Sequence, residues 1–285
     1  MRRLDLGAPE GAASVDVDGV TIAVSRTGQG APVVCLSAIG HGSRDFELLA
    51  ARVKHRVELI CVDWPGHGRS GAAVQPPSAR AYAELLCKLL PALGIKRPIL
   101  VGNSIGGAAA ILYAAKSPVR GLVLCDSGGL VEVTGAVRWV TRAFAAFFTA
   151  GERGAAWFAG AYALYYRMLV LPSSAARAQR RRVVAAGREM AGQLRQAWES
   201  FGRPEADIRA TAQALDVPIW VAWARSDRVI PLSFCRPAIS GLRNAVLTTF
   251  AGGHSPFLED PDAFAEGFMD LVDTLDQRDR VNPAA

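Results

Sequence analysis

One serine stands between two glycines where an apolar run gives way to a helical pattern. Residues 98–101 are typical of a buried strand, and residues 108–115 have apolar side chains at helical spacing. Between them, Gly102-Asn103-Ser104-Ile105-Gly106 has the Gly-x-Ser-x-Gly pattern of a nucleophile elbow, in which small neighbours permit a strained turn. The alternative is a glycine-rich turn with an incidental serine. We predict Ser104 as a nucleophile at a helix N-terminus, which favours developing negative charge.

Two further polar residues follow apolar segments in the second half of the chain. Asp227 lies just past the predicted strand 217–224, and His254 lies on a glycine-rich loop past the predicted strand 245–250. A serine hydroxyl is a poor nucleophile, so it needs a base that a third group orients. The chain order Ser104, Asp227, His254 therefore predicts a catalytic triad at the carboxyl ends of strands.

These motifs resemble those of the α/β-hydrolase superfamily along almost the whole chain. The segment Asp-Trp-Pro-Gly-His-Gly-Arg-Ser at 63–70 is similar to a loop after an early strand in that family, and 253–261 resembles its histidine loop. The resemblance implies Ser104 as nucleophile, His254 as general base and acid, and Asp227 as the orienting carboxylate. It also implies an α/β-hydrolase fold: a mostly parallel eight-stranded sheet flanked by helices, with a helical cap inserted after the sixth strand.

Asp126 competes with Asp227 for the role of the acid. It follows the predicted strand 119–125, at an end where ligand-facing residues gather in open α/β sheets, and some α/β-hydrolases carry their carboxylate there. We favour Asp227 because its strand and the following Ile230-Pro231 match the commoner pattern. The alternative role for Asp126 is a loop residue that accepts hydrogen bonds from nearby backbone N–H groups.

The predicted oxyanion hole departs from the family pattern. The family usually has His-Gly directly after the strand that precedes the first helix, and the next residue donates its N–H. Here Ser37-Ala38 occupies that place, and His41-Gly42 comes four residues later. Counting back from the predicted helix start aligns Ile39 with the donor. We therefore predict the Ile105 and Ile39 N–H groups as the donors. The departure leaves two alternatives open: a wider site, or the Ser37 hydroxyl near the oxyanion.

The remaining pattern predicts one α/β core interrupted by a helical insert. Residues 14–27 alternate around Asp18-Gly19 and predict a β-hairpin. Strands and helices then alternate until the glycines at 128–129, and residues 130–210 contain helical runs such as 137–149 and 155–169 but no strand pattern. We predict the first part of the core at 1–129, the cap at 130–212 and the second part of the core at 213–285.

Composition bears on the compartment and on the classes of protein that can be excluded, and it identifies no reaction. The chain has 285 residues, 51% of them hydrophobic, and five scattered cysteines with no CxxC pair, typical of a reducing compartment. Residues 1–6 lack the apolar region of a secretory signal, and no uncharged apolar run reaches the length of a membrane span. We therefore expect a cytoplasmic protein without membrane contact. Neither metal-ligand spacing nor a nucleotide fingerprint is present, so we expect no metal and no cofactor.

The net charge of +6 comes mainly from arginines, many of them between residues 138 and 195. Nucleic-acid binding would want basic residues interleaved with exposed aromatics on one face, so we expect no nucleic-acid partner. A solvated helical surface is one interpretation of the arginines, and a basic lid that attracts a carboxylate-bearing substrate is the alternative.

Of the other histidines, His67 is expected to brace its loop and His55 to lie at a solvated helix end.

Substrate class is indicated only by the aromatic content of the cap. Most of these aromatic residues are expected to pack within the cap, and the rest to wall an apolar pocket. We predict a serine hydrolase that cleaves a small, largely apolar carboxylic ester. A carbon–carbon bond hydrolase of ring-fission products, a perhydrolase and a ligand-binding receptor of the same fold are the alternatives. The expected partner is a small-molecule substrate, with a homodimer left open. The cap aromatics are Phe144, Phe147, Phe148, Trp157, Phe158, Tyr162, Tyr165 and Tyr166.

Overall fold

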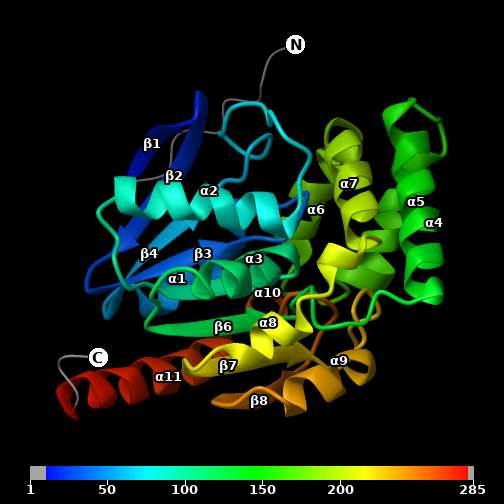
Figure 1. Ribbon diagram of the computed structural model, residues 1–285. Coiled ribbons are helices and arrows are strands. Elements are labelled where there is room, and N and C mark those ends of the chain that lie inside the picture. Colours follow the sequence, from blue (N-terminus) through cyan, green and yellow to red (C-terminus); the bar gives the residue numbers. More distant parts are fainter. Residues whose placement is uncertain (1–10, 282–285) are drawn as a thin grey trace.

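An eight-stranded sheet runs through residues 11–281, which are the residues that the computed structural model describes (Figure 1). The predicted absence of a signal at residues 1–6 concerns residues outside this range. The spatial order is β1-β2-β4-β3-β5-β6-β7-β8; β2 is antiparallel to both its neighbours, and all other pairs are parallel. The predicted fold class is therefore confirmed. The strands are β1 (Ala12–Val17), β2 (Val20–Gly28), β3 (Ala31–Leu36), β4 (Val57–Val62), β5 (Ile99–Asn103), β6 (Gly121–Cys125), β7 (Ile219–Ala224) and β8 (Ala245–Phe250).

The first two strands form the hairpin that the sequence predicts. Asp18 and Gly19 have φ angles of 54° and 79°, and Val17 pairs with Val20 across the turn. Two consecutive positive φ angles match the right-handed twist of the flanking strands, and Asp-Gly is a sequence that supplies them at low cost.

Helices cover both faces of the sheet, which is why β5, β6 and β7 consist of buried residues alone. On one side α1 (Glu47–Val53), α10 (Pro256–Glu259) and α11 (Pro261–Val281) contact one another, while α2 (Ala79–Ala92) and α3 (Ile105–Ala114) form another packed pair. Figure 1 shows α2 and α3 in front of the strands. A further helix, α9 (Leu232–Ser240), packs on β7. The carboxyl ends of the parallel strands remain free to carry polar residues.

Every regular element between β6 and β7 is helical, as the sequence predicts. These elements are α4 (Gly135–Glu152), α5 (Phe158–Tyr165), a π-helical turn (Tyr166–Val170), α6 (Arg177–Ala185), α7 (Gly187–Phe201), a 3₁₀ turn (Pro204–Ala206) and α8 (Arg209–Ala214). Helices α4 to α7 stand together beside the sheet in Figure 1, whereas α8 packs against α3 of the core. Helix α8 thus straddles residue 212, and the exact domain bounds stay a prediction.

The π-helical turn corrects the uninterrupted helix predicted over 155–169. The Leu171 N–H donates to Tyr166 O over 2.8 Å, so the chain gains one residue relative to an α-helical turn. Such turns are rare and often lie at functional sites. Here the turn leads into a non-helical segment, Leu171–Ser174, which we call the strap.

Most cap aromatics pack with one another, as expected. The rings of Phe144 and Trp198 stack with centroids 4.1 Å apart and join α4 to α7. Phe148, Phe158, Tyr162 and Tyr166 are buried, whereas Trp157 is mostly exposed. No helix within residues 11–281 is long and apolar enough to cross a membrane.

Candidate active site

Ser104 occupies a strained turn between β5 and α3. Its φ of 55° and ψ of −119° are rare for a residue with a side chain, and such strain persists only where the surroundings enforce it. A Cβ on Gly102 would lie 2.5 Å from Gly106 O, and one on Gly106 would lie 2.3 Å from Leu36 O. Both glycines are therefore required for the helix to start this close to the strands, as the elbow motif predicts.

His254 and Asp227 form a buried hydrogen-bonded pair. His254 Nδ1 lies 2.9 Å from Asp227 Oδ2, and Asp227 Oδ1 accepts the Val229 and Ile230 N–H groups over 2.7 and 3.0 Å. The carboxylate is thus fixed by its own loop and holds the ring by Nδ1, which leaves Nε2 without a hydrogen-bond partner among residues 11–281. That nitrogen is the one a neighbouring serine would need as its base. No hydrogen bond joins Ser104 Oγ to His254 in the described chain.

Asn103 connects the elbow to the histidine loop. Its side-chain amide donates to His254 O over 2.9 Å and to Cys125 O over 3.0 Å, and its Oδ1 accepts the Ser255 hydroxyl over 2.9 Å. All these groups are buried. The residue before the nucleophile therefore fixes where His254 lies, a role that sequence reasoning missed although Asn103 stands within the elbow motif.

Glu259 is a second positioning group that sequence reasoning missed. Its Oε2 accepts the N–H groups of Gly253 and His254 over 2.5 and 3.1 Å, and its Oε1 accepts the Ser173 N–H over 3.1 Å. Burial raises the pKa of this carboxyl group, while the backbone donors act in the opposite sense. Because Ser173 belongs to the strap, Glu259 joins the cap to the histidine loop.

Asp126, the competing acid, lies in the same cluster. Its Oδ1 accepts the Ala224 N–H over 2.9 Å, and His254 Nδ1 is bonded to Asp227 rather than to Asp126. Ligand atoms of these three residues lie within 4.8 Å of one another, which is close enough to hold a metal ion. The short His254–Asp227 contact, however, requires a proton between nitrogen and oxygen, and a metal ligand needs that lone pair free. The chemistry of the donors thus suits a proton better than a cation.

The predicted oxyanion donors lie on the two segments that meet at the elbow. Ile105 begins α3, Ile39 follows β3, and the approach of Gly106 to the Leu36 and Ser37 carbonyls brings these segments together. Neither the Ile105 nor the Ile39 N–H donates to another described residue. The Ser37 hydroxyl is also buried and has no partner among residues 11–281. The two N–H groups remain available for a ligand oxygen, and their role stays a prediction.

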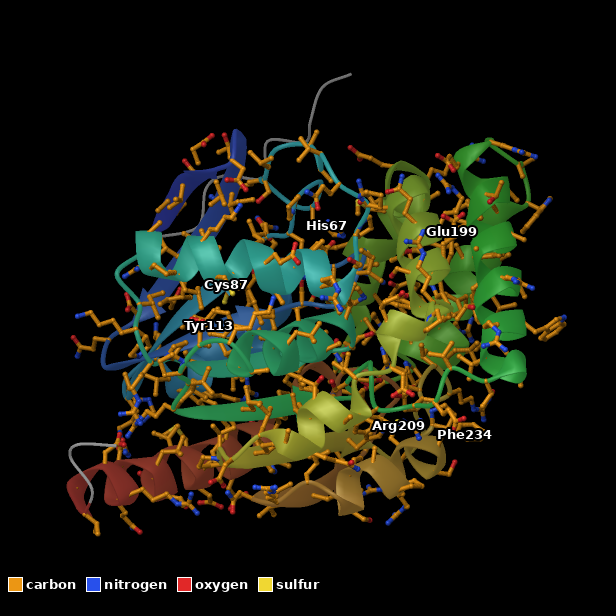
Figure 2. The ribbon with its side chains drawn as sticks, in the orientation of Figure 1. His67, Cys87, Tyr113, Glu199, Arg209 and Phe234 are labelled. Atoms are coloured by element: carbon orange, nitrogen blue, oxygen red, sulfur yellow. The ribbon has the colours of Figure 1, made fainter. Side chains whose placement is uncertain are left out.

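The other histidines brace the loops around the site. His67, which is labelled in Figure 2, accepts the Gly40 N–H at Nε2 over 3.0 Å. Burial lowers its pKa to about 4, so the ring is neutral at neutral pH. His41 turns away into a buried polar cluster: Nδ1 lies 2.7 Å from Asp45 Oδ2, and Nε2 lies 3.0 Å from the Tyr166 hydroxyl. Gln179 donates to Asp45 over 2.5 Å. We call these four residues, His41, Asp45, Tyr166 and Gln179, the latch, because two belong to the core and two to the cap.

The cap contributes one aromatic group to the electrostatics of the site and a basic hollow on its surface. Burial raises the pKa of Tyr165, and the Asp227 carboxylate adds to this effect, so the Tyr165 hydroxyl lies within the field of the candidate triad. A hollow of about 560 Å³ is lined by Arg167, Arg177, Arg180 and Arg181, with Ala163, Pro172, Ser174 and Val184. The basic-lid interpretation of these arginines stays a prediction.

Comparisons with known proteins agree with this architecture. An uncharacterised protein of Mycobacterium tuberculosis is 29% identical over 90% of this chain and 80% of its own length. The pimeloyl-[acyl-carrier protein] methyl ester esterase of Chromobacterium violaceum is 29% identical over 88% of this chain and 98% of its own. A Rhodococcus esterase structure superimposes with a TM-score of 0.77 at 24% identity, covering 93% of this chain and 99% of that one. The model of the alpha/beta hydrolase family matches residues 33–267, so the chain belongs to the alpha/beta hydrolase family.

Proposed function

We propose that this hydrolase cleaves a small, largely apolar carboxylic ester through an acyl-enzyme on Ser104. The observation that carries the proposal is the buried His254–Asp227 pair on the loops that flank a strained serine elbow. Ester chemistry is further supported by the relative from Chromobacterium violaceum, whose name is that of a methyl ester esterase.

The mechanism assigns one task to each group. Ser104 Oγ attacks the ester carbonyl while His254 Nε2 takes its proton, and Asp227 holds the ring in the tautomer with the proton on Nδ1. The Ile105 and Ile39 N–H groups and the start of α3 stabilise the oxyanion. His254 then gives its proton to the departing alcohol. A water molecule, deprotonated by the same nitrogen, hydrolyses the acyl-enzyme and restores the serine.

Ser104 and His254 are largely screened from solvent, since only 7% of Ser104 and 3% of His254 is exposed. We infer that the ester reaches the serine after the cap has moved. Closure excludes water, which strengthens the oxyanion contacts. The side chains expected to face the acyl group, Ile39, Ile105 and Tyr165, are apolar or aromatic, and they favour an acyl group without charge.

A covalent probe and an ester panel test the proposal. A fluorophosphonate should label Ser104 stoichiometrically, and Ser104→Ala should abolish both labelling and the hydrolysis of short p-nitrophenyl esters. A ring-fission dienoate measured beside the esters separates ester from carbon–carbon cleavage. Robust turnover by Ser104→Ala would exclude the serine mechanism, and a preference for the dienoate would move the protein to the carbon–carbon hydrolases.

A further inference from the structure

Asp126 is a fully buried carboxyl group that the mechanism above does not use. It follows β6 with a φ of 42°, and its Oδ1 accepts the Ala224 N–H over 2.9 Å. Its other oxygen, Oδ2, is buried and has no hydrogen-bond partner among residues 11–281 if the group is a carboxylate. Leaving a charged oxygen buried without a donor is costly, so this group needs an explanation.

The surroundings of Asp126 disfavour a second negative charge. The ionisable groups that face it are Asp227 after β7, Glu259 of α10, Cys125 of β6, Cys235 of α9 and His254. Neither a lysine nor an arginine is among these groups. Burial, and then the Asp227 carboxylate, raise the pKa of Asp126 well above its ordinary value. Two carboxyl groups this close favour sharing one proton over holding two charges.

The Asp227 carboxylate can accept one more hydrogen bond, from a proton on Asp126. An ionised carboxylate accepts about four hydrogen bonds, and Asp227 receives three: from His254 Nδ1 and from the N–H groups of Val229 and Ile230. Ligand atoms of Asp126 and Asp227 lie within 4.8 Å of each other, and the nearby Asp227 side chain contributes to the raised pKa of Asp126. A proton on Asp126 Oδ2 gives that orphaned oxygen an acceptor and gives Asp227 its fourth donor.

We propose that Asp126 is a positioning residue that stands protonated beside Asp227 and donates a hydrogen bond to this carboxylate. The pair then carries one negative charge, which lies on the residue bonded to His254. A neutral acid that donates inside an apolar site is a known way to orient an anion. The protonation is independent of the proposed function; only its effect on catalysis rests on that function.

The decisive variant is Asp126→Asn in a Ser104→Ala background, because its readout is stability and needs no activity. The amide can donate to Asp227 and accept from Ala224, and asparagine tolerates a positive φ. Native Asp126 keeps a proton that the unfolded chain releases, so the parent loses stability relative to the variant as pH rises. The ratio of their unfolding equilibrium constants should therefore change about tenfold per pH unit above the ordinary aspartate pKa, until the native group ionises.

Denaturant unfolding between pH 5 and 8 measures this ratio. A ratio that stays flat across this range means that native Asp126 is ionised and overturns the proposal. Asp45→Asn serves as the control, since Asp45 is equally buried but has donors at both oxygens. Asp45→Asn should be less stable than the parent at every pH, whereas Asp126→Asn should become more stable relative to the parent as pH rises.

Kinetics of the Ser104 enzyme test the positioning role. Asp126→Gly keeps the backbone conformation but removes the donor, and it should lower kcat about tenfold or more. Asp126→Asn should restore most of that loss and leave the acid limb of the kcat/KM profile in place. A shift of that limb to lower pH in the Asn variant would show that a negative charge had been removed, which contradicts the proposal. If no ester is hydrolysed at all, the proposed function fails, while the stability result still stands.

Discussion

The protein holds two buried histidine–aspartate pairs that differ on the far side of the imidazole ring. His254 is bonded to Asp227 through Nδ1, and its Nε2 has no partner among the described residues, whereas the corresponding nitrogen of His41 meets the Tyr166 hydroxyl. The first pair keeps one ring nitrogen unbonded, within the described chain, on a loop that Asn103, the residue before the strained serine, contacts, and both ring nitrogens of the second pair are bonded. A buried histidine–carboxylate pair is therefore not catalytic by itself; the unoccupied nitrogen distinguishes the two.

The largest expected effect separates the two aspartates. Asp227→Asn removes the charge that stabilises the imidazolium and favours the wrong tautomer, so kcat should fall by up to about 10⁴-fold. Asp45→Asn should change kcat far less, because His41 faces the cap. Steady-state kinetics of both variants on one ester measure the two kcat values. Equal losses of kcat would contradict the expectation that only the His254–Asp227 pair takes part in catalysis.

His67 is a buried histidine with no carboxylate hydrogen-bond partner among residues 11–281, and it extends the comparison to the pH dependence of stability. Burial lowers its native pKa to about 4, below the ordinary value of 6.5, so the unfolded chain binds the proton more readily. The associated stability is complete above pH 6.5 and is lost as pH falls toward 4, by about 3 kcal/mol in total. Urea denaturation from pH 7 to 4 should show this decline, with a shallower one in His67→Gln. Identical slopes would exclude His67 as the cause.

The latch should affect stability more than chemistry. Tyr166→Phe removes the hydroxyl that bonds His41 and leaves a buried nitrogen unpaired, which should cost about 1–2 kcal/mol of unfolding free energy. Tyr82→Phe is the matched control, because the buried Tyr82 hydroxyl has no partner in the described chain and its loss should cost nothing. Equal costs in denaturant melts would mean that the latch contributes nothing specific.

The smallest expected effect concerns selectivity among esters. Tyr165→Ala opens space near Asp227 and should shift relative kcat/KM toward longer acyl chains by about fivefold, the lower end of the about 1–3 kcal/mol that one methylene contributes in an apolar pocket. Trp157→Ala removes an aromatic ring that is 57% exposed and should leave the ratios unchanged. Unchanged ratios in Tyr165→Ala would exclude this residue as a determinant of chain length.

Sequence patterns located the groups whose neighbours are local and missed those whose partners are distant. The elbow at Ser104 and the alternation of strands and helices along the chain follow from glycines and apolar runs that lie within a few residues of each other. Asn103 meets His254 across 151 positions, and His41 meets Tyr166 across 125. Periodicity carries no information on such contacts. The asparagine and Glu259 both lie inside quoted motifs, yet only the folded loops show what their amides and carboxylates bind.

The connection between strap and histidine loop constrains how the site can open. Val170 O accepts the His254 N–H over 2.8 Å, Glu259 binds both Ser173 and His254, and a Cβ on Gly253 would collide with Pro172. This edge of the cap cannot separate from the core without displacing His254, the proposed base. Helix α7 also contacts the core, because Leu194 lies against Gly40 and Gln193 against Gly66. An opening that leaves His254 in place must therefore break the α7 contacts and keep those of the strap.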